Sequence, residues 1–87
     1  MGVTIQTLEM RGLKREVFLD YFLDLGGALI DGEQIHGPGW EVRLSTEQAI
    51  TLGSITLPVV HVTFLAEKEI VLERIQAFRM RFLSAGG

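Results

Sequence analysis

The chain has 87 residues, no cysteine and a formal net charge of −3 at pH 7. This length predicts a single domain with one core, spanning residues 1–87. The lack of cysteine excludes disulfides, thiolate zinc sites and a cysteine nucleophile. Because 47% of the residues are hydrophobic, the chain is too apolar for intrinsic disorder. Its acidic balance argues against nucleic acid as a partner, since nucleic-acid binders present a basic face.

The sequence gives no sign of a membrane segment or of a secretory signal. No apolar run approaches the roughly 18 residues that a membrane span needs, and the first residues lack a basic region. We therefore expect a cytoplasmic protein with no membrane contact. Basic residues come as two short pairs on separate predicted helices, and we interpret them as solvated helix ends. These pairs are Lys14 with Arg15, and Arg79 with Arg81.

A first strand is predicted over residues 3–10. Val3 and Ile5 alternate with polar residues, and Leu8 and Met10 then alternate in the opposite phase. Such a change of phase indicates a β-bulge near Thr7.

A first helix is predicted over residues 14–25. Its apolar stripe consists of Phe18, Phe22 and Leu25, at spacings of four and three residues. The pair Gly26-Gly27 that follows can end a helix, because glycine readily adopts the left-handed conformation.

The segment 28–65 has the composition of a sheet. Turns are predicted at Asp31-Gly32, at Gly37-Pro38-Gly39 and at Gly53-Ser54. Pro58 is expected at an edge or a bulge, because it cannot donate to a strand ladder. The runs 40–44 and 59–65 have the alternation of half-buried strands. The residues predicted to face the core are Trp40, Val42, Leu44, Val60, Val62 and Phe64.

A second helix is predicted over residues 67–83. Its stripe is spaced four, three and four residues apart, and consists of Val71, Ile75, Phe78 and Phe82. A short polar tail over residues 84–87 follows. The predicted order is therefore strand, helix, several strands and helix. An antiparallel sheet with both helices packed on one face is the simplest α+β arrangement that buries both stripes. The other face of such a sheet is free for a ligand or a partner.

No catalytic centre, metal site or cofactor motif is found in the sequence. The two histidines are His36, in a turn region, and His61, in a strand on the face opposite the core. We interpret each as an exposed or partnered structural histidine, with acid–base or metal chemistry as the alternative. Trp40 is expected to pack in the core or an interface, with stacking in a ligand pocket as its alternative. These three residues are the candidate contacts for a ligand or partner.

The terminal pair Gly86-Gly87 allows two interpretations. It can be an inert tail. It can also be the working end of a carrier, because a terminal di-glycine threads into narrow active sites and its carboxylate can be adenylated. Sulfur carriers and ubiquitin-like proteins present such a tail after the last strand of a β-grasp sheet, whereas here it follows a predicted helix.

Three stretches resemble a known family. They are Tyr21-Phe22-Leu23-Asp24-Leu25-Gly26-Gly27, the run from Leu52-Gly53-Ser54 through Pro58 to Val60-His61-Val62, and Glu73-Arg74-Ile75. The chain resembles the C-terminal domain of MoaD-related proteins, which follows a sulfur-carrier-like β-grasp domain. The resemblance implies a TBP-like fold, β-α-β(4)-α, with a curved antiparallel sheet. It carries over no catalytic residue, and the sulfur-carrier domain itself has no counterpart in this chain.

The leading hypothesis is a non-enzymatic accessory or interaction domain. By association, the resemblance implies a link to molybdenum-cofactor biosynthesis or sulfur transfer, with a MoaD/ThiS-like carrier or a molybdenum-cofactor enzyme as partner. A homodimer is also expected, since a free sheet face or edge can pair with its twin. The alternatives are a small-ligand-binding domain and a carrier activated at Gly86-Gly87.

Overall fold

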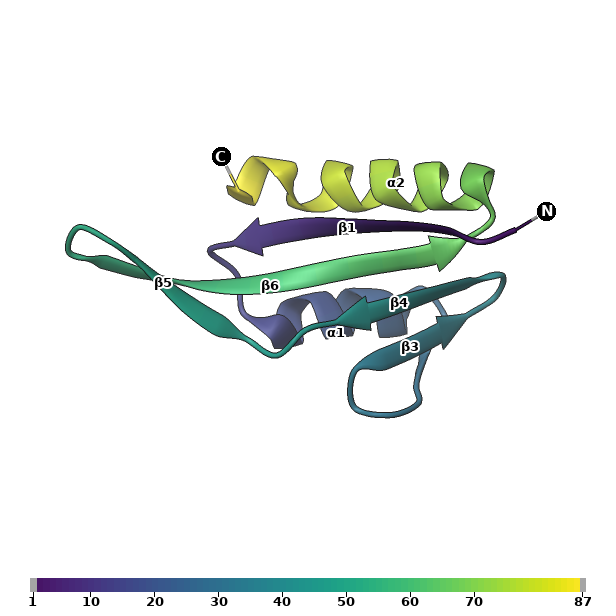
Figure 1. Cartoon of the computed structure of the whole chain (residues 1–87), viewed down its shortest axis with the longest axis horizontal. Coiled ribbons are helices and arrows are strands. Elements are labelled where there is room, and N and C mark those ends of the chain that lie inside the picture. The colour runs from purple at the N-terminus through teal and green to yellow at the C-terminus, as the bar shows by residue number, and fades with distance from the viewer. Residues whose placement is uncertain (1, 87) are drawn as a thin grey trace.

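The computed structural model describes residues 2–86, and for residues 83–86 it describes the backbone alone. The chain has the α+β class predicted from the sequence (Figure 1). The elements in order are β1 (Thr4–Arg11), α1 (Arg15–Asp24), β2 (Ala28–Leu29), β3 (Gln34–Gly37), β4 (Trp40–Leu44), β5 (Gln48–Leu52), β6 (Ile55–Ala66) and α2 (Lys68–Gly86). In the described part of the chain, neither helix combines the length and apolar character that a membrane crossing requires.

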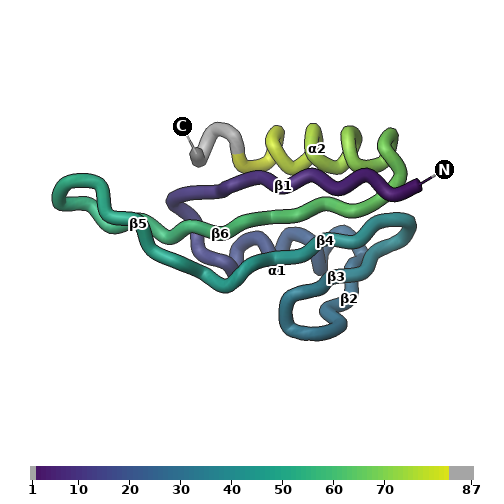
Figure 2. The backbone as a smooth tube through the Cα atoms, viewed as in Figure 1, coloured from purple at the N-terminus to yellow at the C-terminus, as the bar shows by residue number. Residues whose placement is uncertain are grey.

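The sheet is built around its longest strand, β6, which has 12 residues. The strand order is β1-β6-β4-β3-β2, with β5 also paired to β6, and the strand pairs are antiparallel. Strand β1 pairs with the second part of β6, from Thr4 opposite Ala66 to Arg11 opposite Val59. On the other side of β6, β5 pairs with residues 55–59 and β4 with residues 62–65. Figure 2 follows the chain through this path.

Strand β5 and the start of β6 form a hairpin that projects from the rest of the molecule, at the left of Figure 1. We call this hairpin, residues 48–59, the arm. Its turn contains Gly53 with a φ of +64°, a conformation that favours glycine. The arm makes the molecule elongated, with extents of 46 × 25 × 21 Å. Leu52 and Ile55, beside the turn, remain 49% and 59% exposed.

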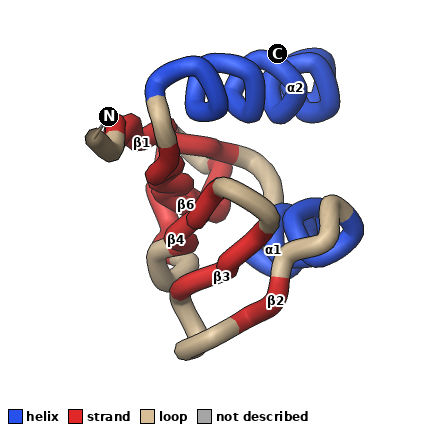
Figure 3. The backbone as a smooth tube through the Cα atoms, turned by 90° about the vertical axis from the view of Figure 1, so that its right-hand side faces the viewer, coloured by secondary structure: helices blue, strands red, loops and turns tan. Residues whose placement is uncertain are grey.

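Both helices pack on the same face of the sheet, as Figure 3 shows. Phe78 of α2 is fully buried and its ring lies 5.6 Å from that of Phe22 on α1 and 5.5 Å from that of Phe64 on β6. These aromatic contacts join the two helices to the sheet in one core. The stripe predicted for α2 is confirmed, and so are Phe18 and Phe22 of the first stripe, whereas Leu25 follows α1 and is only partly buried against the core. The buried helix residues are Phe18, Phe22, Val71, Ile75, Phe78 and Phe82.

The end of α1 depends on two glycines. Gly26 has a φ of +95°, and its N–H bonds to the carbonyl of Leu23. A Cβ on Gly27 would lie 2.8 Å from the carbonyl oxygen of Phe22 and 2.9 Å from the Trp40 ring. The chain therefore needs glycine at position 26 for its conformation and at position 27 for space.

The predicted bulge near Thr7 is wrong, because β1 pairs residue for residue with β6 along its whole length. The change of apolar phase has another cause. Leu8 and Met10 pack against the core, whereas Ile5 lies on the opposite face and is 64% exposed. Val3 precedes the strand. The apolar residues of β1 therefore lie on both faces of one regular strand, which explains the change of phase in the sequence.

Other boundaries differ more modestly from the prediction. Strand β2 has only two residues and adds a fifth strand between the helices, where the resemblance implied four. Helix α2 continues through Gly86, so its backbone includes most of the predicted polar tail. Pro58 lies inside β6, where β1 ends, and its carbonyl accepts from Gly12 N–H. The backbone N and C=O of a strand residue point to the same side of the strand, so the nitrogen of Pro58 also points toward the β1 side of β6. The N–H that proline lacks is therefore not needed for the hydrogen bonds between β5 and β6.

Candidate functional site

The sheet face opposite the helices is polar where strands β1, β6, β4 and β3 meet. In an antiparallel pair, directly opposed residues lie on the same face. Glu9 on β1 is opposite His61 on β6, and Glu41 on β4 is opposite His36 on β3. Since Val60 and Val42, the neighbours of His61 and Glu41, are buried on the helix side, these polar residues belong to the other face. We call it the open face.

The first polar cluster on the open face consists of Glu9, Arg11 and His61. Arg11 Nε donates to Glu9 Oε2 at 2.6 Å, and His61 Nε2 lies 3.4 Å from Glu9 Oε1. The hydrogen bond from Arg11, with its positive charge, lowers the pKa of Glu9 from its ordinary value, and His61 adds to this effect. Glu9 therefore remains an anion at neutral pH, with Oε2 accepting a hydrogen bond from Arg11 and Oε1 lying close to His61.

The second cluster consists of Glu41, Arg43 and His36 and repeats the first. Arg43 Nε donates to Glu41 Oε2 at 2.9 Å, and His36 Nε2 lies 3.4 Å from Glu41 Oε1. In both clusters the arginine follows the glutamate by two residues, which places the two side chains on the same face of one strand. The histidine comes from the neighbouring strand in both.

The two clusters form an exposed surface rather than an enclosed centre. The side chains of His61 and His36 are 42% and 48% exposed. Thr7 and Thr63, a cross-strand pair on the same face, share a hydroxyl hydrogen bond of 2.9 Å. Among the described residues, no group of three or more histidine, aspartate or glutamate side chains could hold a metal ion. Such a surface offers a protein partner positive and negative charges as well as hydrogen-bond donors and acceptors.

Of the three candidate contact residues, two lie on this face and one does not. His36 and His61 lie on β3 and β6, each beside its own glutamate. Trp40 is only 6% exposed and packs in the core, with its ring 5.9 Å from that of Phe22. Its alternation with Val42 and Leu44 pointed to this position.

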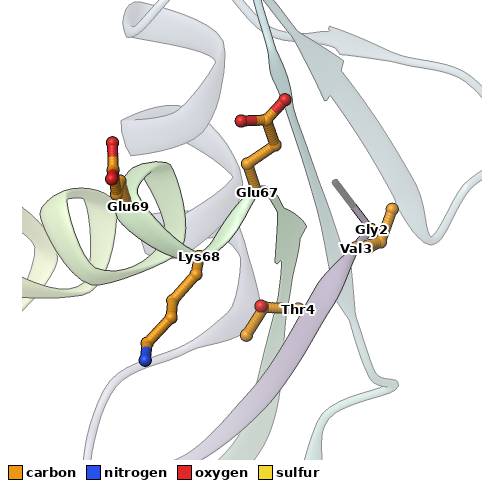
Figure 4. A pocket seen from close by; sticks show the side chains of 6 residues that line it. All are labelled: Gly2, Val3, Thr4, Glu67, Lys68 and Glu69. Carbon is orange, nitrogen blue, oxygen red and sulfur yellow. The ribbon is translucent and has the colours of Figure 1, made fainter.

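A pocket lies where β1 and α2 begin, and no residue of the two clusters lines it (Figure 4). Figure 4 shows the side chain of Lys68 pointing away from those of Glu67 and Glu69, so these charges do not converge on one point. The pocket therefore lacks the convergent polar groups of a reaction centre.

The C-terminal candidates can be placed only in part. Gly86 belongs to the backbone of α2, and Gly87 lies outside the described residues.

The sequence predictions missed the glutamates and arginines of the open face. His36 and Glu41 flank the turn at residues 38–39, so the hairpin register could have paired them. Nothing in the sequence indicated that Glu9 would meet His61.

The chain matches the model of a known protein family. The family model described as archaeal MoaD-like protein matches residues 6–87, nearly the whole chain. The matched region includes the open-face clusters and the terminal glycines. None of the curated proteins matches the sequence.

Proposed function

We propose, from the premise that this chain belongs to the archaeal MoaD-like family, that it is a non-enzymatic protein of sulfur transfer in molybdenum-cofactor biosynthesis. In this proposal it acts in the cytoplasm by binding another protein through its open face. The partner would be a MoaD/ThiS-like carrier or a molybdenum-cofactor enzyme. The curved antiparallel sheet with both helices on one side supports a TBP-like fold for this domain.

The observation that carries the proposal is the pair of Glu–His–Arg clusters on a sheet face that no helix of the described chain covers. Each cluster holds a carboxylate between a guanidinium and an imidazole, at half-exposed positions. Exposed ion pairs of this kind contribute little to folding, because water and salt screen them. Their arrangement on the free face favours a role in recognition, where charge complementarity selects partners.

A site-specific photo-crosslinker tests the proposal directly. A photoreactive residue replaces Thr63, at the centre of the open face, and in a matched protein it replaces Leu72, which is 53% exposed on α2. Both proteins are irradiated in native extract, and the adducts are identified by mass spectrometry. We expect the Thr63 probe to capture a sulfur carrier or cofactor-synthesis enzyme and the Leu72 probe to capture neither. Equal capture from both positions, or adducts that contain no protein of this pathway, would refute the proposal.

A second candidate function is a carrier activated at Gly87, and one observation favours it. The family match extends through both terminal glycines. In this function, ATP would convert the terminal carboxylate to an acyl adenylate with release of pyrophosphate. Hydrosulfide would then attack the acyl carbon and displace AMP, which gives the thiocarboxylate without a change of oxidation state. The helical backbone up to Gly86 differs from the β-grasp arrangement in which known carriers present their tails.

Intact-protein mass spectrometry separates the two functions. The chain is incubated with ATP and an adenylating enzyme of the pathway, beside a chain that lacks Gly87. A mass increase that matches a C-terminal adenylate, present only in the full chain, would establish activation. An unchanged mass would exclude the carrier function and leave the binding function intact.

A further inference from the structure

Two hydrogen-bond donors without acceptors lie side by side on the helix side of the molecule. Trp40 Nε1 and Arg74 Nε are both buried and have no hydrogen-bond partner within the described residues. They are also neighbours, because the guanidinium carbon of Arg74 lies 5.8 Å from the centre of the Trp40 ring. Leaving a buried donor unpaired costs about 1–3 kcal/mol. Two such donors in contact indicate a place where an acceptor is missing.

A second arginine and a hydroxyl continue this group along the helices. Arg81 follows Arg74 by seven residues, so both side chains leave α2 on the same flank. Tyr21 of α1 faces this flank, with its ring 5.7 Å from that of Phe78 and 5.2 Å from that of Phe82. We call Tyr21, Trp40, Arg74 and Arg81 the inter-helix cluster.

Arg81 reaches the same aromatic group as Tyr21, because its guanidinium carbon lies 5.1 Å from the centre of the Phe82 ring, which is 5.2 Å from that of Tyr21. Burial raises the pKa of Tyr21, and the positive charges of Arg74 and Arg81 act in the opposite direction. The hydroxyl therefore stays protonated at neutral pH and can donate. The described ion pairs all lie on the open face, so neither arginine of the cluster is neutralised by a described carboxylate.

We propose that the inter-helix cluster binds a phosphate group, such as that of a small phosphorylated metabolite. Arg74 and Arg81 would supply the charge, and Tyr21 and Trp40 would supply neutral O–H and N–H donors. A guanidinium matches an oxyanion with two parallel hydrogen bonds. A phosphate fits better than a carboxylate because it offers more acceptor oxygens to donors that come from both helices and from β4. Arg81 is exposed and Arg74 is half-buried, so phosphate reaches the two arginines from solvent. The N–H of Trp40 is buried in this structure, so its hydrogen bond to phosphate needs a shift of the neighbouring Arg74 side chain.

This site is independent of the proposed function, because it lies on the opposite side of the sheet from the open face. Loss of phosphate binding would leave partner binding at the open face unaffected. Loss of partner binding at the open face would likewise leave phosphate binding unaffected, so each proposal can be refuted without the other.

The chain provides its own probe, since Trp40 is its only tryptophan. The indole N–H therefore gives a single signal in a ¹⁵N–¹H spectrum. Inorganic phosphate is added at constant ionic strength, with sodium chloride and sodium acetate as parallel titrations. We expect a saturable shift of the indole signal with phosphate, a much weaker one with acetate and none with chloride.

Three arginine variants test the assignment of residues. Arg74→Gln and Arg81→Gln should each weaken phosphate binding about tenfold or more, since each removes charged hydrogen bonds. Arg79→Gln removes the same charge from the same helix and is the control. Arg79 lies roughly 140° around the helix from Arg74, so phosphate binding should stay unchanged. If Arg74→Gln does not fold, as judged by circular dichroism, the exposed Arg81 still provides the comparison with Arg79.

Three results would overturn the proposal. The first is the absence of a saturable indole shift with phosphate. The second is equal weakening by Arg79→Gln and Arg81→Gln, which would show a diffuse attraction to basic charge. The third is equal affinity for acetate and phosphate, which would exclude a phosphate-specific site.

Discussion

At the scale of single residues, Phe78 makes more ring contacts than any other aromatic side chain among the described residues. Its ring meets those of Phe18, Tyr21, Phe22, Phe64 and Phe82, with centroid distances from 4.9 to 5.7 Å. These rings come from both helices and from the central strand. The side chain is therefore the common point at which three elements of the fold meet.

We expect Phe78→Ala to lower the free energy of unfolding by about 3–5 kcal/mol, because it leaves a cavity between the helices and the sheet. A small domain has about 5–15 kcal/mol in total, so the variant should be marginally folded. The measurement is urea denaturation followed by circular dichroism. Met80→Ala on the same helix is the control, because Met80 is 78% exposed. A loss at Phe78 no greater than that at Met80 would contradict the packing described.

The ion pair of Glu9 on the open face makes the stability of the fold depend on pH. Its pKa is lowered in the folded protein by Arg11 and, to a smaller extent, by His61. A carboxyl with a lowered folded pKa stabilises the protein above its unfolded pKa, and the contribution is lost as pH falls through the folded value.

We therefore expect stability to fall more steeply below pH 4.5 in the parent protein than in Glu9→Gln. Urea denaturation at a series of acidic pH values measures the two slopes. Arg11→Gln should raise the pKa of the Glu9 carboxyl toward its ordinary value, which carbon NMR can follow. Identical slopes in the parent and Glu9→Gln would show that the ion pair does not form in solution.

At the scale of elements, the β3–β4 hairpin is fitted closely around Trp40. A Cβ on Gly37 would overlap atoms Cε2 and Cζ2 of the indole, which the core holds in place. The hairpin turn itself contains Gly39, with a φ of +79°. Position 37 therefore needs glycine for space, whereas position 39 needs it for conformation.

We expect Gly37→Ala to displace Trp40 and to cost about 1–3 kcal/mol. The tryptophan fluorescence should shift to longer wavelength as the indole becomes more exposed. Gly53→Ala is a useful contrast, because a Cβ there meets no atom within 4 Å while the φ is +64°. It should cost about 1–2 kcal/mol through backbone strain and leave the fluorescence unchanged. An unaltered emission spectrum in Gly37→Ala would refute the close fit.

The helices and the central strands could be predicted because their patterns reflect burial on one side. The stripes on α1 and α2, and the alternation around Val42 and Val62, correspond directly to buried positions. Strand β1 was misread because it carries apolar residues on both faces, Leu8 toward the core and Ile5 away from it. Strand β2 is too short to produce a period.

The open-face clusters were only partly accessible from sequence. His61 was correctly expected on the face opposite the core, because its neighbours Val60 and Val62 are apolar. Its contact with Glu9 depends on the register between strands at opposite ends of the chain. Local patterns do not fix such a register. The inter-helix cluster was inaccessible for the same reason, since it combines α1, β4 and α2.

At the scale of the whole molecule, the projecting arm has a free strand edge and exposed apolar residues. Strand β5 has no strand on its outer edge in the described chain, and its exposed Leu52 lies beside the tip. Free edges and exposed apolar residues favour pairing between copies.

We expect small-angle X-ray scattering to give a radius of gyration near 13.1 Å at low concentration, the value of the single chain. The radius should rise with concentration as arms pair. Leu52→Lys should abolish the rise, since it places a charge at the tip. Glu73→Lys on α2 serves as the matched surface change. A radius that stays constant up to high concentration would show that the arms do not associate.

The central position of β6 has a consequence for synthesis. Strand β1 emerges from the ribosome before β6, yet it pairs with residues 59–66 of β6, which are synthesised much later. Strands β3 and β4 can pair early because a short turn joins them, whereas β1 cannot pair until β6 has been synthesised. Contacts between such distant segments slow folding. The nascent chain would therefore hold an unpaired first strand until β6 appears, a period in which a chaperone could shield it.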